Sequence, residues 1–322
     1  MSRAERECYG ERFRPPGAVL PGGRRSSTIL ISMPLLGSLG RSLALSLSAG
    51  ALACSAQVDE DHATTETGST RAVITVTRSA QAATPDDARA DAFAGFVRTP
   101  ASADAKSSLA VAGLGLDLPT AGECRKGARG ETSATTPALT RLELLDAGEV
   151  TLAAGGSVTT LAPRAFPTIT DSIAGVVYTT RDRAAAPLPA ASTYTVATTG
   201  GSSLAALSGE VQAPALLKSV DLAGEPLASP EPLSAHKDLD VTWAAGSAGD
   251  HVYVELEAGG DSHLCTFLDE AGHGVIPGAL VPGPGSATVT VHRVREALFT
   301  DQAVTRGSVR FDFELAASVT FE

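Results

Sequence analysis

The chain has 322 residues, of which 43% are hydrophobic, 19% are charged and only 4% are aromatic. This length and apolar content suffice for one or two domains with buried cores, which excludes disorder throughout. The formal net charge of −11 argues against a nucleic-acid partner, because contact with phosphates requires a basic face. No apolar run reaches the roughly 20 residues of a membrane-spanning helix, which excludes a polytopic membrane protein.

The first 53 residues are predicted to direct export and not to fold. Residues 1–28 are polar and rich in arginine, with several prolines and glycines, and we interpret residues 1–32 as an upstream extension. Translation then starts at Met33, although Met1 stays open as the start. In residues 33–53, Arg41 precedes a short apolar stretch that ends in small residues, which is the three-part pattern of a secretory signal peptide.

Cys54 follows Ala53 directly and resembles the lipidated cysteine of a bacterial lipobox. Leu52 stands one place later than the leucine of that motif, and ordinary cleavage after Ala53 is the alternative. We expect a lipid anchor on Cys54 that holds the protein to a membrane. By resemblance to Gram-negative lipoproteins, Ser55 favours the outer membrane. Residues 54–70 have too few apolar side chains to offset their ordering entropy, and they are predicted to form a flexible acidic tether.

From Arg71 onward, apolar and polar residues alternate with period two in short runs that predict antiparallel strands. The exception is the stretch 85–98, where alanines and charged residues after Pro85 predict a helix. Residues 99–137 are predicted to form a long loop that contains Cys124. Residues 71–212 therefore form the first expected domain, with further strands at 141–145, 149–153, 157–161, 176–180 and 193–198.

Residues 213–322 contain seven expected strands in roughly 110 residues, which is typical of an immunoglobulin-like or fibronectin-like sandwich. Trp243 is predicted to be the core tryptophan of this second domain. The predicted fold class is all-β, with two antiparallel immunoglobulin-like β-sandwich domains, the first carrying a short helix and a long loop. The seven strands are expected at 215–221, 239–243, 251–257, 263–268, 287–295, 308–315 and 318–321.

Several phrases of the folded part resemble those of uncharacterised predicted outer-membrane or periplasmic lipoproteins from high-GC Gram-negative bacteria. The similarity spans roughly residues 70–322 and implies β-sandwich domains at the cell envelope, but no activity. The phrases lie at 144–150, 164–167, 175–180, 241–243, 264–277 and 289–293.

Four residues in one stretch, His263, Cys265, Asp269 and His273, are of the types that bind zinc. His263 and Cys265 share a strand face with Phe267, however, and cysteine is commonly buried as a small hydrophobe. With no regularly spaced Cys or His pair in support, these four are weak candidates, and neither a metal nor another cofactor is expected.

Cys124 and Cys265 remain beside Cys54 after export and can pair in an oxidising compartment. Because sequence cannot place two thiols within bonding distance, two separate thiols stay as the alternative. The phrase 245–249 comes close to a Gly-x-Ser-x-Gly nucleophile elbow, but strands are expected on both sides, which predicts a hairpin loop and no catalytic residue.

These patterns predict an exported, lipid-anchored cell-envelope protein with a non-catalytic structural or interaction role. The first alternative is a surface binding module for a glycan, a peptide or an adhesion partner, and the anchor-free form would be extracellular. The second is a secreted hydrolase or metal-dependent enzyme with a dispersed site. An exposed patch of Tyr178, Tyr194 or Tyr253 would favour binding, and a cleft that gathers His263, His273 and Asp269 would favour chemistry.

Overall fold

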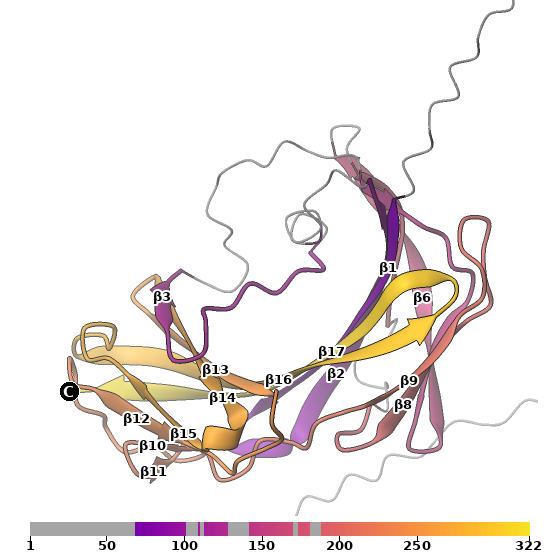
Figure 1. Ribbon diagram of the computed structural model, residues 1–322. Helices are drawn as coiled ribbons and strands as arrows, with labels where there is room; N and C mark the ends of the chain where they lie inside the picture. The colour runs from indigo at the N-terminus through magenta and orange to yellow at the C-terminus, as the bar shows by residue number, and fades with distance from the viewer. Residues whose placement is uncertain (1–67, 101–108, 110–112, 128–141, 170–172, 181–187) are drawn as a thin grey trace, which may run out of the picture. The chain divides into compact units, whose positions relative to one another are not determined.

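The structure, a computed structural model, describes residues 68–100, 109, 113–127, 142–169, 173–180 and 188–322. The described residues belong to one compact unit. The expected signal peptide, Cys54 and most of the tether lie outside the described residues. Nearly all regular structure is β, as predicted, and the sheets are consistent with a β-sandwich (Figure 1). Among the described residues, no helix has the length and apolar character needed to cross a membrane.

Within the described residues, the strands form one sheet of thirteen strands and one of four. The order in the larger sheet is β3-β14-β13-β16-β17-β1-β2-β4-β7-β6-β5-β8-β9, and in the smaller sheet β11-β10-β12-β15. The bounds are β1 Ser69–Gln81, β2 Thr84–Thr99, β3 Cys124–Lys126, β4 Leu142–Leu144, β5 Val150–Ala154, β6 Ser157–Ile169, β7 Ile173–Thr179, β8 Thr193–Thr198, β9 Ser208–Gln212, β10 Asp221–Leu222, β11 Glu225–Pro226, β12 Leu239–Thr242, β13 His251–Ala258, β14 Asp261–Leu268, the short 3₁₀ helix η1 Asp269–Ala271, β15 His273–Ile276, β16 Gly285–Asp301 and β17 Val304–Phe321.

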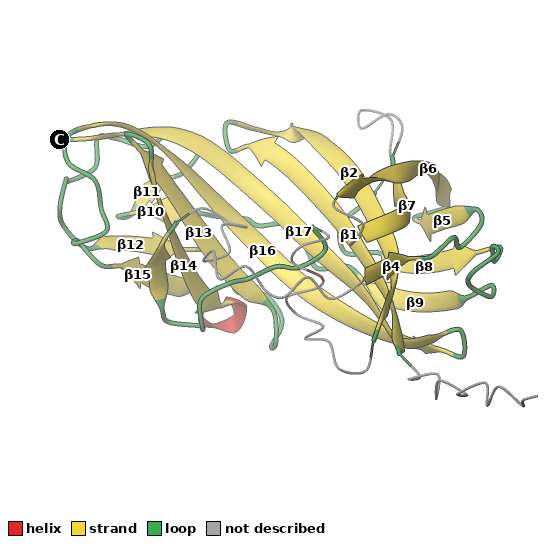
Figure 2. Ribbon diagram, turned by 90° about the horizontal axis from the view of Figure 1, so that it is seen from above, coloured by secondary structure: helices red, strands yellow, loops and turns green. Residues whose placement is uncertain are grey.

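The two longest strands, β16 and β17, pair antiparallel and contribute one face to two separate hydrophobic cores (Figure 2). In β17, every second residue from Val309 to Phe313 packs in the first core, and every second residue from Ala317 to Phe321 packs in the second. Because side chains alternate across a strand, all six lie on the same face of the sheet. A single long hairpin therefore joins the two cores.

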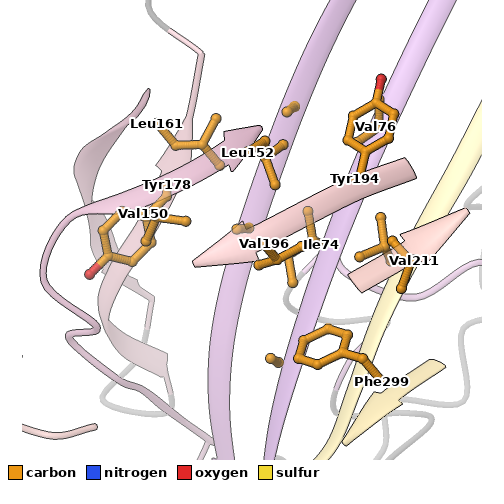
Figure 3. Close-up of a cluster of buried hydrophobic side chains, with 14 of the residues drawn as sticks. Ile74, Val76, Val150, Leu152, Leu161, Tyr178, Tyr194, Val196, Val211 and Phe299 are labelled. Atoms are coloured by element: carbon orange, nitrogen blue, oxygen red, sulfur yellow. The ribbon is translucent and has the colours of Figure 1, made fainter. Parts of the chain in front are cut away.

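The first core lies between β1, β2 and β17 on one side and β5, β8 and β9 on the other. Figure 3 shows Val196 of β8 beside Ile74 of β1, and Val150 beside Tyr178. The ring of Tyr194 meets that of Phe311 edge to face, with 5.0 Å between the centroids. The second core packs the four-stranded sheet against β13, β14, β16 and β17, and it includes Trp243, which confirms this residue as a core tryptophan.

The opposite face of the larger sheet is also covered, in part by residues 114–118. Leu116 and Leu118 pack against a small cluster of Tyr253, Leu264 and Val294. Leu114 belongs to another cluster on this face with Val73, Val97, Leu142, Leu144 and Val177. The sheet is therefore buried on both faces here, and Tyr253 is fully buried although it faces away from the second core.

The predicted helix at 85–98 is wrong, because this stretch forms strand β2. It pairs with β1 in an antiparallel ladder, with Ala72 opposite Phe96 and Val76 opposite Ala92. Ala90, Ala92, Ala94 and Phe96 are buried at every second position, which is the strand period. A weak local preference for helix gives way here to the burial that pairing provides.

Two other strand predictions also differ from the structure. Of the expected strand 215–221 only Asp221 is in a strand, the two-residue β10, and the expected strands 308–315 and 318–321 are both parts of β17. The expected loop 99–137 contains β3, while residues 101–108, 110–112 and 128–137 of it lie outside the described residues.

The division into two immunoglobulin-like domains is not confirmed and stays a prediction. Strand β1, from the first expected domain, pairs in parallel with β17, from the second, with Val76 opposite Phe311. The first core likewise takes residues from both sides of the expected boundary at 212/213.

Candidate functional site

Cys124 and Cys265 form a disulfide between β3 and β14. Of the two alternatives, a disulfide or two separate thiols, the structure contains the disulfide. The two residues are direct partners in the β3–β14 ladder. Strand β3 has only three residues, and its sheet hydrogen bonds are few. The covalent link therefore fixes β3 at the edge of the larger sheet, and it removes Cys265 from any set of metal-binding thiolates.

The four weak metal candidates do not come together. His273 is exposed, and its Nδ1 lies 2.9 Å from the carbonyl oxygen of Ala271. Asp269 is fully buried in an ion pair with Arg293. His263 is a neighbour of the disulfide on β14, but its buried Nδ1 has no hydrogen-bond partner among the described residues. The cleft of His263, His273 and Asp269 that would have favoured chemistry is not formed.

Asp269 instead anchors η1 to the core-facing side of β16, between the two cores. Arg293 reaches it through Nη2 and Nε, each 2.8 Å from a carboxylate oxygen, and the Trp243 indole N–H donates to it over 3.0 Å. Arg293 also donates to the carbonyl oxygens of Leu216 and Ala244. Because a buried charge is costly without such partners, this pair fixes the junction between the loops and β16.

A second ion pair lies two residues along the same face of β16. Arg295 donates from Nε and Nη2 to the two carboxylate oxygens of Asp250, at 2.7 and 2.6 Å. These bonds raise the pKa of Arg295, so the guanidinium stays charged. Asp250 ends the loop after β12. This loop contains residues 245–249, the phrase that comes close to a Gly-x-Ser-x-Gly nucleophile elbow. The expected strands flank this loop, but it joins the two sheets and is not a hairpin.

The opposite face of β16 and β17 carries a buried cluster around His292. Its Nδ1 lies 2.8 Å from Oδ1 of Asp312 and 3.4 Å from Oε2 of Glu314. The Tyr253 hydroxyl donates to Oδ2 of Asp312 over 3.1 Å, and its ring stacks on the imidazole with centroids 4.0 Å apart. His292 is 2% exposed and Asp312 is 0% exposed, so the pair is shielded from water.

This cluster has the atoms of a metal site, since one ligand atom from each of His292, Asp312 and Glu314 lies within 4.8 Å of the others. An imidazole that ligates through Nδ1 carries its proton on Nε2 and normally donates it to an acceptor. Nε2 of His292 is buried and has no hydrogen-bond partner among the described residues. The geometry therefore fits an imidazole that donates its Nδ1–H to Asp312 better than it fits a metal ligand.

The three tyrosines that could have formed a binding patch are all buried within strands. Tyr178 accepts a hydrogen bond from the Ala147 amide and donates one to Asp146, while Tyr194 donates to the Pro189 carbonyl oxygen. Burial raises the pKa of both phenols. Tyr178 and Tyr194 point into the first core, and Leu116 and Leu118 cover Tyr253, so no exposed tyrosine patch forms within the described residues.

Asp146 organises the turn that precedes β5. Its carboxylate accepts hydrogen bonds from the Gly148 amide, the Tyr178 hydroxyl and Ser202. These bonds, that from Gly148 foremost, hold the pKa of Asp146 below its usual value. The carboxylate therefore joins two loops of the first core while it remains ionised at neutral pH.

The His292 cluster and the Arg293–Asp269 pair were not found from the sequence. Alternation already placed Asp312 and Glu314 on one face of their strand, but their meeting with His292 depends on the register of β16 against β17. No family model matches the chain, and a comparison with curated proteins gives no match either. The roles assigned above rest on the contacts of these residues.

Proposed function

We propose that this chain is an exported, lipid-anchored protein of the bacterial cell envelope, with a non-catalytic structural or interaction role. The observation that carries the proposal is the disulfide between Cys124 and Cys265. Disulfides form and persist in oxidising compartments such as the periplasm and are rare in the cytosol. The bridge thus agrees with the export that residues 33–53 predict.

The bridge also has a large effect on the unfolded chain, because its cysteines are 141 residues apart. Loop-closure entropy for a segment of that length corresponds to about 5 kcal/mol, an upper value for its effect on stability. A fold that gains this much from oxidation is suited to a compartment that keeps thiols oxidised.

The internal polar groups support a structural role. The carboxylates of Asp269 and Asp312 and the hydroxyls of Tyr178 and Tyr194 are directed to partners within the chain. Buried polar groups that satisfy one another in this way make the packing specific. The alternative of a binding module is supported by a separate cavity, which is described in the next section.

The test is the intact mass and detergent partitioning of the protein from native membranes, beside Cys54→Ala and the control Cys8→Ala. We expect a mature chain that begins at Cys54, carries added acyl mass and enters the detergent phase. Cys54→Ala should leave the membrane fraction, whereas Cys8→Ala should behave as the wild type because export removes Cys8. An unmodified chain that begins at Cys54 and is free in the medium would refute the anchor, and a full-length chain with reduced thiols would refute export.

A further inference from the structure

A cavity of about 620 Å³ lies on the face of β1, β16 and β17 that points away from the two cores. Leu109 and residues 114–118 line its other side. This volume is in the range of sites for small ligands. The cavity shares no lining residue with the His292 cluster or with the Arg293–Asp269 pair.

Three arginines, Arg71, Arg306 and Arg310, line the cavity. Arg71 and Arg306 are direct partners in the parallel ladder between β1 and β17, so two cations lie on neighbouring strands and on the same face. Strands in a sheet are about 4.8 Å apart, so the two side chains start from adjacent backbone positions, and like charges held near one another repel. Arg310 follows on the same face, where it donates to the Thr75 hydroxyl and the Leu114 carbonyl oxygen.

The two carboxylates of the lining have partners other than Arg71. Asp117 is held by Arg125, with 2.6 Å between Oδ2 and Nη1. Glu296 lies 3.6 Å from Arg306, and both side chains are about half exposed, so water screens their attraction. Arg71 forms no ion pair within the part of the chain that the structure describes. In a chain of net charge −11, this is a local concentration of cations.

The remainder of the lining is largely apolar. Val73 and Val294 come from the sheet, and Leu109, Leu114, Leu116 and Leu118 come from the covering segment. Apolar walls with a few convergent charged groups are the usual composition of a pocket for a small molecule. The walls accept hydrocarbon, while the arginines accept a carboxylate or a phosphate, for which their guanidinium groups are suited.

We propose that this cavity binds an amphiphilic anion, a molecule with a carboxylate or phosphate head and a hydrocarbon body. Its head would lie between Arg71 and Arg306 and relieve their repulsion, and its body would lie along Leu116 and Val294. The site is independent of the anchor on Cys54 and gives the protein a ligand of its own.

The test is isothermal titration calorimetry of the purified Cys54→Ala chain, which has no attached acyl group that could compete. The probes are dodecanoate, dodecyl phosphate, inorganic phosphate and dodecanol. We expect one dodecanoate or dodecyl phosphate per chain, with dodecanol and inorganic phosphate each bound at least about 10-fold more weakly. Each of these two lacks one half of the interaction, either the charge-assisted hydrogen bonds or the apolar contact.

Variants then locate the ligand. Arg71→Gln should weaken binding of both amphiphilic anions about 10-fold, the effect of losing a charge-assisted hydrogen bond, and Arg71→Lys should lose less. The matched control is Arg89→Gln, an exposed arginine of β2 that does not line the cavity and should change Kd by less than roughly 2-fold. Unchanged thermal unfolding of each variant establishes that it is folded.

Three results would overturn the proposal. They are the absence of binding by both amphiphilic anions, binding of dodecanol as tightly as dodecanoate, and an equal effect of Arg71→Gln and Arg89→Gln. Tight binding of inorganic phosphate alone would also contradict it, because the apolar walls would then contribute nothing. None of these outcomes bears on the lipidation of Cys54, which the mass measurement decides separately.

Discussion

Removal of the negative charge of Asp269 should strongly destabilise the fold. In Asp269→Asn the amide keeps the shape of the side chain, but Arg293 loses its counter-charge while it is only 3% exposed. Breaking a buried ion pair by removing one partner typically costs about 3–5 kcal/mol, because the remaining charge is left in a medium of low polarity. Arg293 keeps its carbonyl acceptors on Leu216 and Ala244, so we expect a value near the lower end, about 3 kcal/mol.

The assay is denaturant unfolding at constant pH, with the free energy obtained from the midpoint at an unchanged slope. The matched control is Glu296→Gln, which removes an acid from the exposed pair with Arg306 and should cost less than about 1 kcal/mol. The double variant Asp269→Asn with Arg293→Met should lose less than the sum of the two single variants, since the two groups are in contact. If Asp269→Asn costs no more than Glu296→Gln, the buried pair does not hold this junction as argued.

Three further predictions concern other parts of the fold. Cys124→Ser combined with Cys265→Ser should lower the free energy of unfolding by about 2–5 kcal/mol, and equal midpoints for oxidised and reduced protein would contradict the role of the bridge. Gly95→Val places a β-carbon 2.7 Å from Cδ1 of Leu114 and should lower the free energy of unfolding by about 1–3 kcal/mol. An unchanged thermal unfolding temperature would contradict this, because it would mean that residues 114–118 move to make room for the valine. Because the folded-state pKa of Asp146 is lowered, its ionised carboxylate stabilises the fold above the unfolded-state pKa, and this contribution is lost as the pH falls through the folded-state pKa. Asp146→Asn should therefore reduce the loss of unfolding free energy at acid pH. An unchanged dependence of the unfolding free energy on pH would refute this prediction.

Local sequence patterns were sufficient to predict strands and buried residues where one face of a strand packs in a core. The period-two alternation in the expected strand 308–315 agrees with the burial of Val309, Phe311 and Phe313 in β17, because period two is a property of the strand itself. The strand at Thr193–Thr198 was predicted with its full bounds, and Trp243 was correctly placed in a core. These predictions depend only on spacing and hydrophobicity, which are local to a few residues.

The predictions failed where a distant segment changes the environment of a strand. Tyr253 faces away from the second core, as alternation requires, but Leu116 and Leu118 cover it. The stretch 85–98 has alanines and charges that suit a helix, yet pairing with β1 buries its alternate alanines. Neither outcome can be obtained from composition, because the deciding partner lies elsewhere in the chain.

The sequence by itself determined the all-β class and the faces of several strands, since both are encoded in short runs of residues, while the export signal stays a prediction. Only the tertiary structure decided that Cys124 meets Cys265, that His292 meets Asp312, and that Arg71 lies beside Arg306. Each of these contacts joins residues on neighbouring strands, and strand order and register set which residues meet. Register is fixed by the packing of whole faces, so it is a property of the assembled sheet and not of any one segment.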